Sequence, residues 1–228
     1  MAAMLLVLAL IFSLAVLPQM WVRRTIERHS AERADFPGTG GEFARHVLDE
    51  MRLGNVKVEE SPLGDHYDPE RKIVRLSPQH FKGRSLAAVV IAAHEAGHAM
   101  QDATGYPPLE ARTRLAKQAL RVEKVAAVVM LAAPILMALA KAPQLLVLEV
   151  FIGVMMFALS ILVHAVTLPV EFDASFRRAL PVLRAGRYIG DKDLRAARQI
   201  LKAAAFTYVA AAAMSLLDVA RWFRLLRL

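Results

Sequence analysis

Long uninterrupted runs of apolar residues recur along this chain. Positions 1–22 carry no charged side chain, and Arg23 and Arg24 follow at once. A helix needs about 20 apolar residues to cross the hydrocarbon core of a bilayer, so this run predicts an N-terminal transmembrane anchor over 1–22. A cleaved secretory signal is the alternative interpretation. Such a signal carries a basic region before its apolar run, which this sequence lacks.

Two further apolar runs lie in the middle of the chain, at 125–140 and 145–170. The short connector Lys-Ala-Pro at 141–143 lies between them, which predicts a tight transmembrane helical hairpin within 122–170. A fourth run, at 203–217, is rich in alanine and marginal in length. It is compatible with a membrane span, an interfacial helix or a buried core helix, and these alternatives stay open.

The stretch 23–121 is polar enough to form a water-facing domain. Apolar residues recur at helical spacing over 42–52, whereas 56–60 and 72–76 alternate apolar and polar residues as strands do. Ser85 precedes a long apolar run and predicts the cap of a buried helix. Together the patterns predict a mainly α protein, with membrane helices plus a small α+β domain whose short sheet lies beside that helix.

Composition and charge agree with a membrane protein. The hydrophobic share is 56%, above the roughly 45–50% of ordinary soluble domains. The net charge is +8, and Lys and Arg concentrate in 23–121 and 169–202. Because such residues stay on the cytoplasmic side, both stretches are predicted to lie there, in a multi-pass protein of the cell membrane. Three arginines between 221 and 227 do not fit this scheme if the fourth run spans. The basic residues lack interleaved aromatics, which disfavours nucleic-acid binding.

The most specific chemical signal is the segment His94-Glu95-Ala96-Gly97-His98, an H-E-x-x-H motif in the apolar helix. The four-residue separation puts both imidazoles on one face, about one turn apart, where they can hold one metal ion. Glu95 lies near that face and can take a proton from metal-bound water. Gly97 leaves room for another backbone. The chain has no cysteine, so we expect zinc held by His and carboxylate ligands.

Catalytic zinc needs a third protein ligand. The chain leaves the motif helix, crosses the membrane, turns and returns at 168–175, so Glu171 is expected on the same membrane side as His94. The residues alone leave Glu171 open between a metal ligand and a solvated acid at a helix start. His66 and Tyr67 are also open. Either of them donates a hydrogen bond to a developing oxyanion, or their segment is simply a turn closed by the flanking aspartates.

The segments AAHEAGHAMQ, DHYDP and TLPVEFDAS, in this order, resemble the YugP-type bacterial membrane zinc metallopeptidases, distant kin of the gluzincin membrane proteases. The resemblance covers most of the chain. It implies a zincin-like domain, Zn²⁺ as cofactor and Glu171 as the third ligand. The kin usually have an Asp four residues after that ligand to orient a ligand histidine. This chain has Ser175 there, with Asp173 nearby, so either residue is a candidate for that role.

The resemblance also implies a role for the strand 72–76. It would form the edge of the small sheet, where a substrate peptide adds as another strand, and Arg75 between apolar neighbours suits an edge. The segment 171–228 would be a helical region that carries the third ligand and the last apolar helix.

These features predict a membrane-embedded zinc endopeptidase acting on peptide or protein substrates, membrane proteins among them, at the cytoplasmic face of the lipid bilayer. Glu95 is the predicted general base. One alternative is a site-2-type intramembrane protease with Asp49 or Asp218 as the third ligand. Another is a non-catalytic scaffold whose structural zinc is closed by a fourth ligand, such as His66 or Asp173. No feature indicates an oligomeric state.

Overall fold

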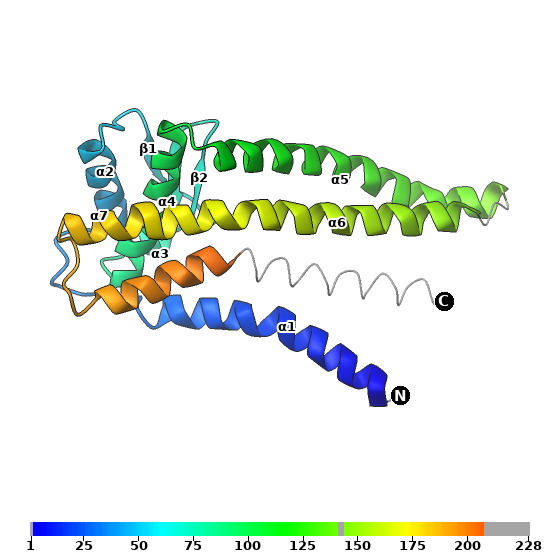
Figure 1. The fold of residues 1–228 in the computed structure, drawn as a ribbon, viewed down its shortest axis with the longest axis horizontal. Coiled ribbons are helices and arrows are strands. Elements are labelled where there is room, and N and C mark those ends of the chain that lie inside the picture. Colours follow the sequence, from blue (N-terminus) through cyan, green and yellow to red (C-terminus); the bar gives the residue numbers. More distant parts are fainter. Residues whose placement is uncertain (1, 141–143, 208–228) are drawn as a thin grey trace.

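The computed structural model describes residues 2–140 and 144–207 and is built largely of helices (Figure 1). Its elements in chain order are α1 (Ala2–Glu27), α2 (Gly40–Glu50), β1 (Lys57–Glu60), β2 (His66–Asp68), β3 (Ile73–Leu76), α3 (Pro78–Lys82), α4 (Leu86–Ala103), α5 (Pro107–Ala140), α6 (Gln144–Phe172), the π-helix η1 (Asp173–Ala179) and α7 (Leu180–Ala185). A further helix covers 194–207. A mainly helical fold with one small sheet confirms the predicted fold class at that level.

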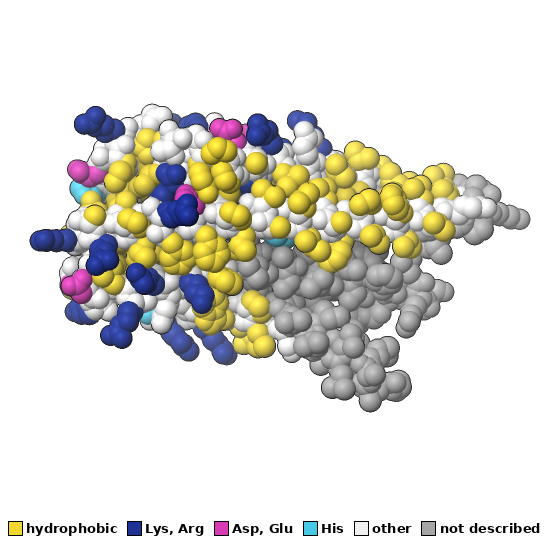
Figure 2. Space-filling model, in the orientation of Figure 1, with side chains coloured by type: hydrophobic (Ala, Val, Ile, Leu, Met, Phe, Trp, Pro, Cys, Tyr) yellow, Lys and Arg dark blue, Asp and Glu magenta, His cyan; other side chains and the backbone are white. Residues whose placement is uncertain are grey.

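The helices α5 and α6 pack together as a long hairpin that projects from the small domain (Figure 1). Apolar side chains are exposed along it, among them Val128, Leu131, Val147 and Phe151. Figure 2 shows apolar side chains along the hairpin and Lys and Arg side chains around the domain end. In the described part of the chain, one helix is long and apolar enough to cross a membrane, the continuous helix Val147–Ala185. Only 6% of its apolar window is buried, as expected for a surface that needs an apolar environment.

The helix that carries Glu171 does not start near that residue. α6 passes through Pro169, and η1 and α7 continue it without a break. Glu171 is only 1% exposed, so the interpretation of a solvated acid at a helix start is wrong. In the described part of the fourth apolar run, Ala203 and Ala205 are fully buried, whereas Phe206 is half-buried and Thr207 is exposed. The rest of that run and the three arginines after it lie outside the described residues.

The sheet corrects one expectation about the strand 72–76. The strand order is β1-β3-β2, with β1 parallel and β2 antiparallel to β3. β3 is therefore the central strand and has no edge to offer a substrate. Arg75 tolerates this position because its guanidinium is 3.0 Å from Asp68 of β2 and 3.7 Å from Glu59 of β1. Because Arg75 is paired with a carboxylate on each neighbouring strand, its charge does not indicate an edge strand of the sheet.

The motif helix α4 is the centre of the small domain. As predicted, Ser85 caps it, accepting a hydrogen bond from the Ala88 amide at 3.1 Å. Every residue from Leu86 to Gln101 is buried, because α2, the sheet, η1 and α7 all pack around this helix. The H-E-x-x-H residues are therefore held in the core rather than on a surface.

Gly97 lets α4 and η1 approach closely, as the sequence predicted. A Cβ atom on Gly97 would lie 2.7 Å from the carbonyl oxygen of Ala174, closer than any ordinary contact. That backbone connects Glu171 to the residues that follow it in η1. The separation of the two helices is therefore set by the missing side chain.

We expect Gly97→Ala to destabilise the protein. The added methyl group forces α4 and η1 apart, and overpacking of this kind costs about 1–3 kcal/mol, partly offset by the better helix propensity of alanine. Gly153→Ala in α6 is the matched control, since a Cβ there meets no atom within 4 Å. Thermal unfolding in detergent should show a lower Tm for Gly97→Ala alone. Equal Tm values for both variants would contradict the proposed close approach.

Candidate metal centre

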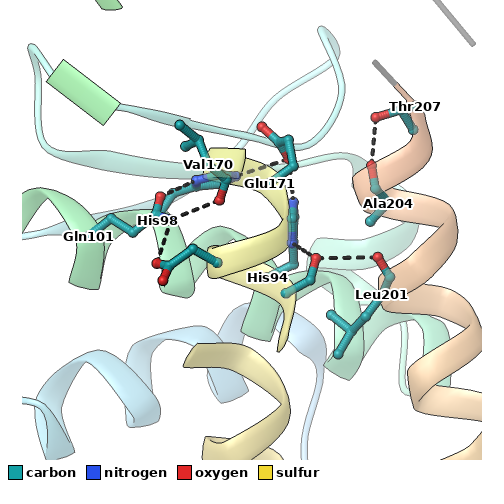
Figure 3. A network of polar contacts seen from close by, with 10 residues as sticks. His94, His98, Gln101, Val170, Glu171, Leu201, Ala204 and Thr207 are labelled. Carbon is teal, nitrogen blue, oxygen red and sulfur yellow. Dashed lines mark hydrogen bonds and ion pairs between the residues drawn. The ribbon is translucent and has the colours of Figure 1, made fainter. Parts of the chain in front are cut away.

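Two helices far apart in the chain bring three metal-binding side chains together (Figure 3). His94 and His98 lie one turn apart on α4, and Glu171 reaches them from the end of α6. The Nε2 atoms of His94 and His98 are 3.1 Å and 3.4 Å from Oε2 of Glu171. One ligand atom from each residue lies within 4.8 Å of the others, and all three residues are buried. The geometry thus brings together the three predicted zinc ligands.

Hydrogen bonds on the far side of each imidazole fix its orientation. The Ser175 hydroxyl donates to the Leu201 carbonyl at 3.3 Å and accepts from Nδ1–H of His94 at 3.0 Å. The Oε1 atom of Gln101 accepts from Nδ1–H of His98 at 2.9 Å. With the proton on Nδ1, each Nε2 atom presents its lone pair toward Glu171. This is the tautomer that a metal requires.

Gln101 is itself held by three groups. Its Nε2 atom donates to the Val170 carbonyl at 2.8 Å and to Oδ2 of Asp173 at 2.9 Å. The same Asp173 oxygen accepts from Nε of Arg178 at 2.8 Å. Both donor hydrogens of the amide are therefore used, so Oε1 must be the atom that faces His98. Gln101 is fully buried, and no water competes for these bonds.

The two candidate orienting residues from the sequence have different places in this network. Ser175 contacts His94 directly, whereas Asp173 reaches His98 only through Gln101. Sequence reasoning did not single out Gln101. The available signal was a polar residue three positions after His98, on an apolar helix where an unsatisfied amide would be costly to bury.

Glu95 lies beside the three ligands in an apolar environment and is only 6% exposed. Burial raises its pKa to about 8; the neighbouring Glu171 adds to the rise, and His94 and Arg112 oppose it. The side chain borders the same cavity as the ligands. Glu95 is therefore a proton-carrying group directed at the space in front of the metal ligands.

A cavity of about 310 Å³ opens in front of these residues. Its lining combines the ligands and Glu95 with side chains of α1, β2, α5 and the helix 194–207, including Ile26, Arg112, Ala204 and Thr207. Arg112 was not predicted, because its sequence environment marks it only as one of many basic residues. Ile26 and Arg112 bring the end of α1 and the start of α5 to this cavity.

His66 and Tyr67 line this cavity, but their polar atoms already have partners. The Tyr67 hydroxyl donates to Asp102, which also pairs with Lys72. Burial and the Asp102 charge raise the pKa of Tyr67 far above its usual value. Nδ1–H of His66 donates to the Gly64 carbonyl at 3.2 Å.

Of the flanking aspartates, Asp68 closes a turn, whereas Asp65 bonds to residues 12 and 15 positions away, at the start of α3. Asp65 accepts hydrogen bonds from Ser77 and His80, and Asp68 accepts them from the amides of Glu70 and Arg71. The segment was expected to be a turn, yet its centre forms the short strand β2. Only three residues long and polar at both ends, β2 carries no periodic signal, and its pairing with β3 decides the structure.

Among the described residues, the alternative ligand Asp49 does not reach this site. Asp49 is exposed on α2 and pairs with Arg45 at 2.8 Å, and Asp218 lies outside the described residues. Asp173, offered as a fourth ligand, is occupied by Gln101 and Arg178. Within the described ranges the metal-binding group comprises His94, His98 and Glu171.

The residues fit a zinc ion on two grounds. Oε1 of Glu171 is buried without a hydrogen-bond partner among the described residues, which is costly unless a cation satisfies it. Two imidazole nitrogens and a carboxylate are also the donor set typical of a zinc site with an open position. The arrangement is a buried His-His-Glu group, built around the H-E-x-x-H motif, that is suited to hold a metal ion.

Comparison with known proteins assigns the family. Residues 3–227 match the model of the family described as "Putative neutral zinc metallopeptidase". The chain belongs to this family of zinc peptidases, and zinc is its cofactor. It is also 35% identical over 206 residues to "Putative membrane protease YugP" of Bacillus subtilis (strain 168), an overlap covering 90% of this chain and 88% of the relative. No solved structure matches it. The resemblance seen in the sequence is thus confirmed.

We expect loss of either histidine partner to weaken zinc binding. Ser175→Ala and Gln101→Leu each remove the acceptor that fixes one tautomer, and such changes cost about 10–100-fold in metal affinity. Gln79→Leu, at an exposed position of α3, is the control. Competition against a fluorescent chelator measures the affinity. Wild-type affinity in both variants would show that these hydrogen bonds do not tune the site.

Proposed function

We propose that the protein is a membrane-embedded zinc endopeptidase. The observation that supports this most directly is the convergence of His94, His98 and Glu171 beside Glu95 at one cavity. A site with three protein ligands keeps a position open for water and substrate, as catalytic zinc sites do. Hydrolysis of a peptide bond is the chemistry that this set of groups performs.

The protein residues divide the work as follows. His94, His98 and Glu171 hold the zinc, which when bound polarises a peptide carbonyl and lowers the pKa of water. Glu95 accepts the proton of the attacking water and then delivers it to the leaving amine. Ser175 and Gln101 keep the two imidazoles in the required tautomer throughout.

The substrate is proposed to bind as an extended peptide beside β2. His66 and Tyr67 of this strand line the cavity, and β2 is an edge strand because it pairs with β3 alone in the described sheet. Backbone hydrogen bonds to an edge strand recognise peptides with little dependence on sequence. Side-chain specificity would then come from the other walls of the cavity.

We further propose that α1 and the α5–α6 hairpin cross the cell membrane and that the small domain lies on the cytoplasmic face. The exposed apolar surface of the hairpin supports embedding, and the distribution of Lys and Arg supports the orientation. α1 meets the other helices at an aromatic cluster. The ring centroid of Phe206 lies 6.3 Å from that of Trp21 and 5.7 Å from that of Phe172. The metal centre would then lie at the membrane surface, within reach of membrane-protein substrates.

The two alternatives have less support. A site-2-type protease requires an aspartate ligand, and the buried acid beside the histidines is Glu171. A structural zinc requires closure by a fourth ligand. The described site instead has three ligands and a cavity in front of them.

We expect Glu95→Gln and Glu171→Ala to separate catalysis from metal binding. Glu95→Gln preserves the shape of the side chain but not its proton transfer, so zinc should be retained while cleavage of a quenched peptide pool falls at least about 10²-fold. Glu171→Ala should lose zinc as well as activity. Zinc content by mass spectrometry gives the first readout. Equal cleavage by Glu95→Gln and wild type would refute the proposed hydrolysis.

Single cysteines test the orientation, since the chain contains none. Lys141→Cys, in the connector of the hairpin, should react with a membrane-impermeant maleimide in intact spheroplasts. Arg71→Cys, exposed after β2, should react only after permeabilisation, because the domain faces the cytoplasm. The reverse pattern would place the metal centre outside the cell and contradict the proposal.

A further inference from the structure

A second cluster of polar side chains lies at the start of β2 and contributes none of the three metal ligands. Asp65, the residue before this strand, accepts hydrogen bonds at Oδ1 from the Ser77 amide at 2.8 Å and from the Ser77 hydroxyl at 3.0 Å. Its Oδ2 atom accepts a third bond from Nδ1–H of His80 at 2.7 Å. We call these three residues the Asp65 cluster. The proposed mechanism of hydrolysis leaves the cluster without a role.

The bond between His80 and Asp65 is kept at a cost to stability. His80 is only 6% exposed, and its Nε2 atom is buried without a hydrogen-bond partner among the described residues. An unsatisfied polar atom of this kind destabilises a folded protein. Burial alone would raise the pKa of Asp65, but its bonds to His80 and Ser77 outweigh that effect and hold the pKa below its usual value. Asp65 is therefore an ionised acceptor that is firmly held.

The cluster connects β2 to a part of the domain that has little freedom to move. Ser77 precedes α3 and His80 lies within it. The first residues of α2 pack directly on this helix, since a Cβ atom on Gly40 would overlap the His80 carbonyl oxygen. The Gly40 amide also donates to the Gly83 carbonyl at 3.0 Å. Asp65 is thus tied to a helix that cannot shift without moving α2.

β2 needs such an anchor because it has little other support at its start. The strand is three residues long and pairs with β3 alone in the described sheet. The loop before it is exposed, with Leu63 87% accessible. Two residues of the strand, His66 and Tyr67, line the cavity together with Asp65. The Asp65 cluster therefore helps to set where this wall of the cavity lies relative to the metal ligands.

We propose that the Asp65 cluster positions the substrate. By fixing the start of β2, it sets the register in which an extended peptide pairs with this strand, and hence which peptide bond reaches the metal ligands. This inference rests on the proposed function, including the pairing of the substrate with β2. His80 is a positioning residue, because it acts through Asp65. Displacing a reacting bond by about 1 Å is enough to slow a reaction by about 10²-fold.

Substitutions of His80 in the full-length, zinc-loaded protein test this role. His80→Leu removes the donor to Asp65 and keeps an apolar side chain in the buried site. His80→Asn restores the donor, because its Nδ2 atom takes the place of the imidazole Nδ1, and it removes the unpartnered Nε2 atom. Gln79→Leu, at the exposed neighbouring position of α3, is the control. Each variant is given a long quenched peptide of one defined sequence and a blocked tripeptide too short to pair along β2. The readouts are kcat/KM for both substrates, the cleaved bonds by mass spectrometry, and zinc content.

We expect His80→Leu to lose about 10²-fold in kcat/KM for the long peptide and to cleave it at additional bonds. Its zinc content and its cleavage of the tripeptide should stay at the wild-type level, because the ligands and Glu95 are unchanged. His80→Asn should keep both the rate and the cleavage site, and Gln79→Leu should match the wild type.

Several results would overturn the proposal. One is an unchanged rate and cleavage site for the long peptide in His80→Leu. Another is an equal loss on both substrates, or a loss of zinc, since the cluster would then only stabilise the fold. A third is failure of His80→Asn to rescue, which would mean that the bond to Asp65 is not what matters.

The wild type separates this inference from the proposed function. If it cleaves neither substrate, the proposed hydrolysis itself is refuted. If it cleaves the tripeptide as fast as the long peptide, hydrolysis stands, but the pairing with β2 and the positioning role of the Asp65 cluster both fail.

Discussion

The structure depends on the buried hydrogen bonds that hold His94 and His98 correctly rotated inside a helix core. An imidazole in a dry environment must satisfy both ring nitrogens, and a metal requires one specific tautomer. Ser175 and Gln101 meet that condition from η1 and from α4 itself. Because Gln101 also binds Val170 and Asp173, the same bonds join α4 to the long helix that carries Glu171. The same hydrogen bonds therefore set both the geometry of the ligands and the packing of the two helices.

The long helix connects the proposed membrane region to the metal ligands and their hydrogen bonds. From Val147 to Ala185 it runs without a break, and its π-helical part, Asp173–Ala179, begins two residues after Glu171. π-helical turns are frequent at functional sites. Here the turn lies against α4 at Gly97, where no side chain separates the two backbones. A displacement of this helix would move Glu171 and the partner of His94 together, so the hairpin and the metal centre are mechanically coupled.

Much of this site could be predicted because its signals are local or tied to a recognisable motif. The H-E-x-x-H spacing identified the two histidines and Glu95, the hairpin predicted the return of Glu171, and Ser85 marked the start of the motif helix. The features that the sequence did not predict depend on tertiary contacts. β2 is a strand only because β3 pairs with it, and β3 is central only because β1 lies on its other side. Gln101 and Arg112 acquire their places from contacts between elements that no periodicity encodes.

The chemical nature of the histidine partners has a consequence for the metal. Carboxylates often serve as such partners and make the ligand imidazole more basic. This site already holds Glu95 and Glu171 beside the histidines, and another acid in contact with a ring would add negative charge to a low-dielectric space. Ser175 and Gln101 instead orient the rings with neutral groups. The nearby acid Asp173 does not contact the His98 ring, because Gln101 lies between them. Asp173 is also paired with Arg178 at 2.8 Å. A zinc ion held by these imidazoles would keep more of its charge than one whose histidine ligands are paired with acids.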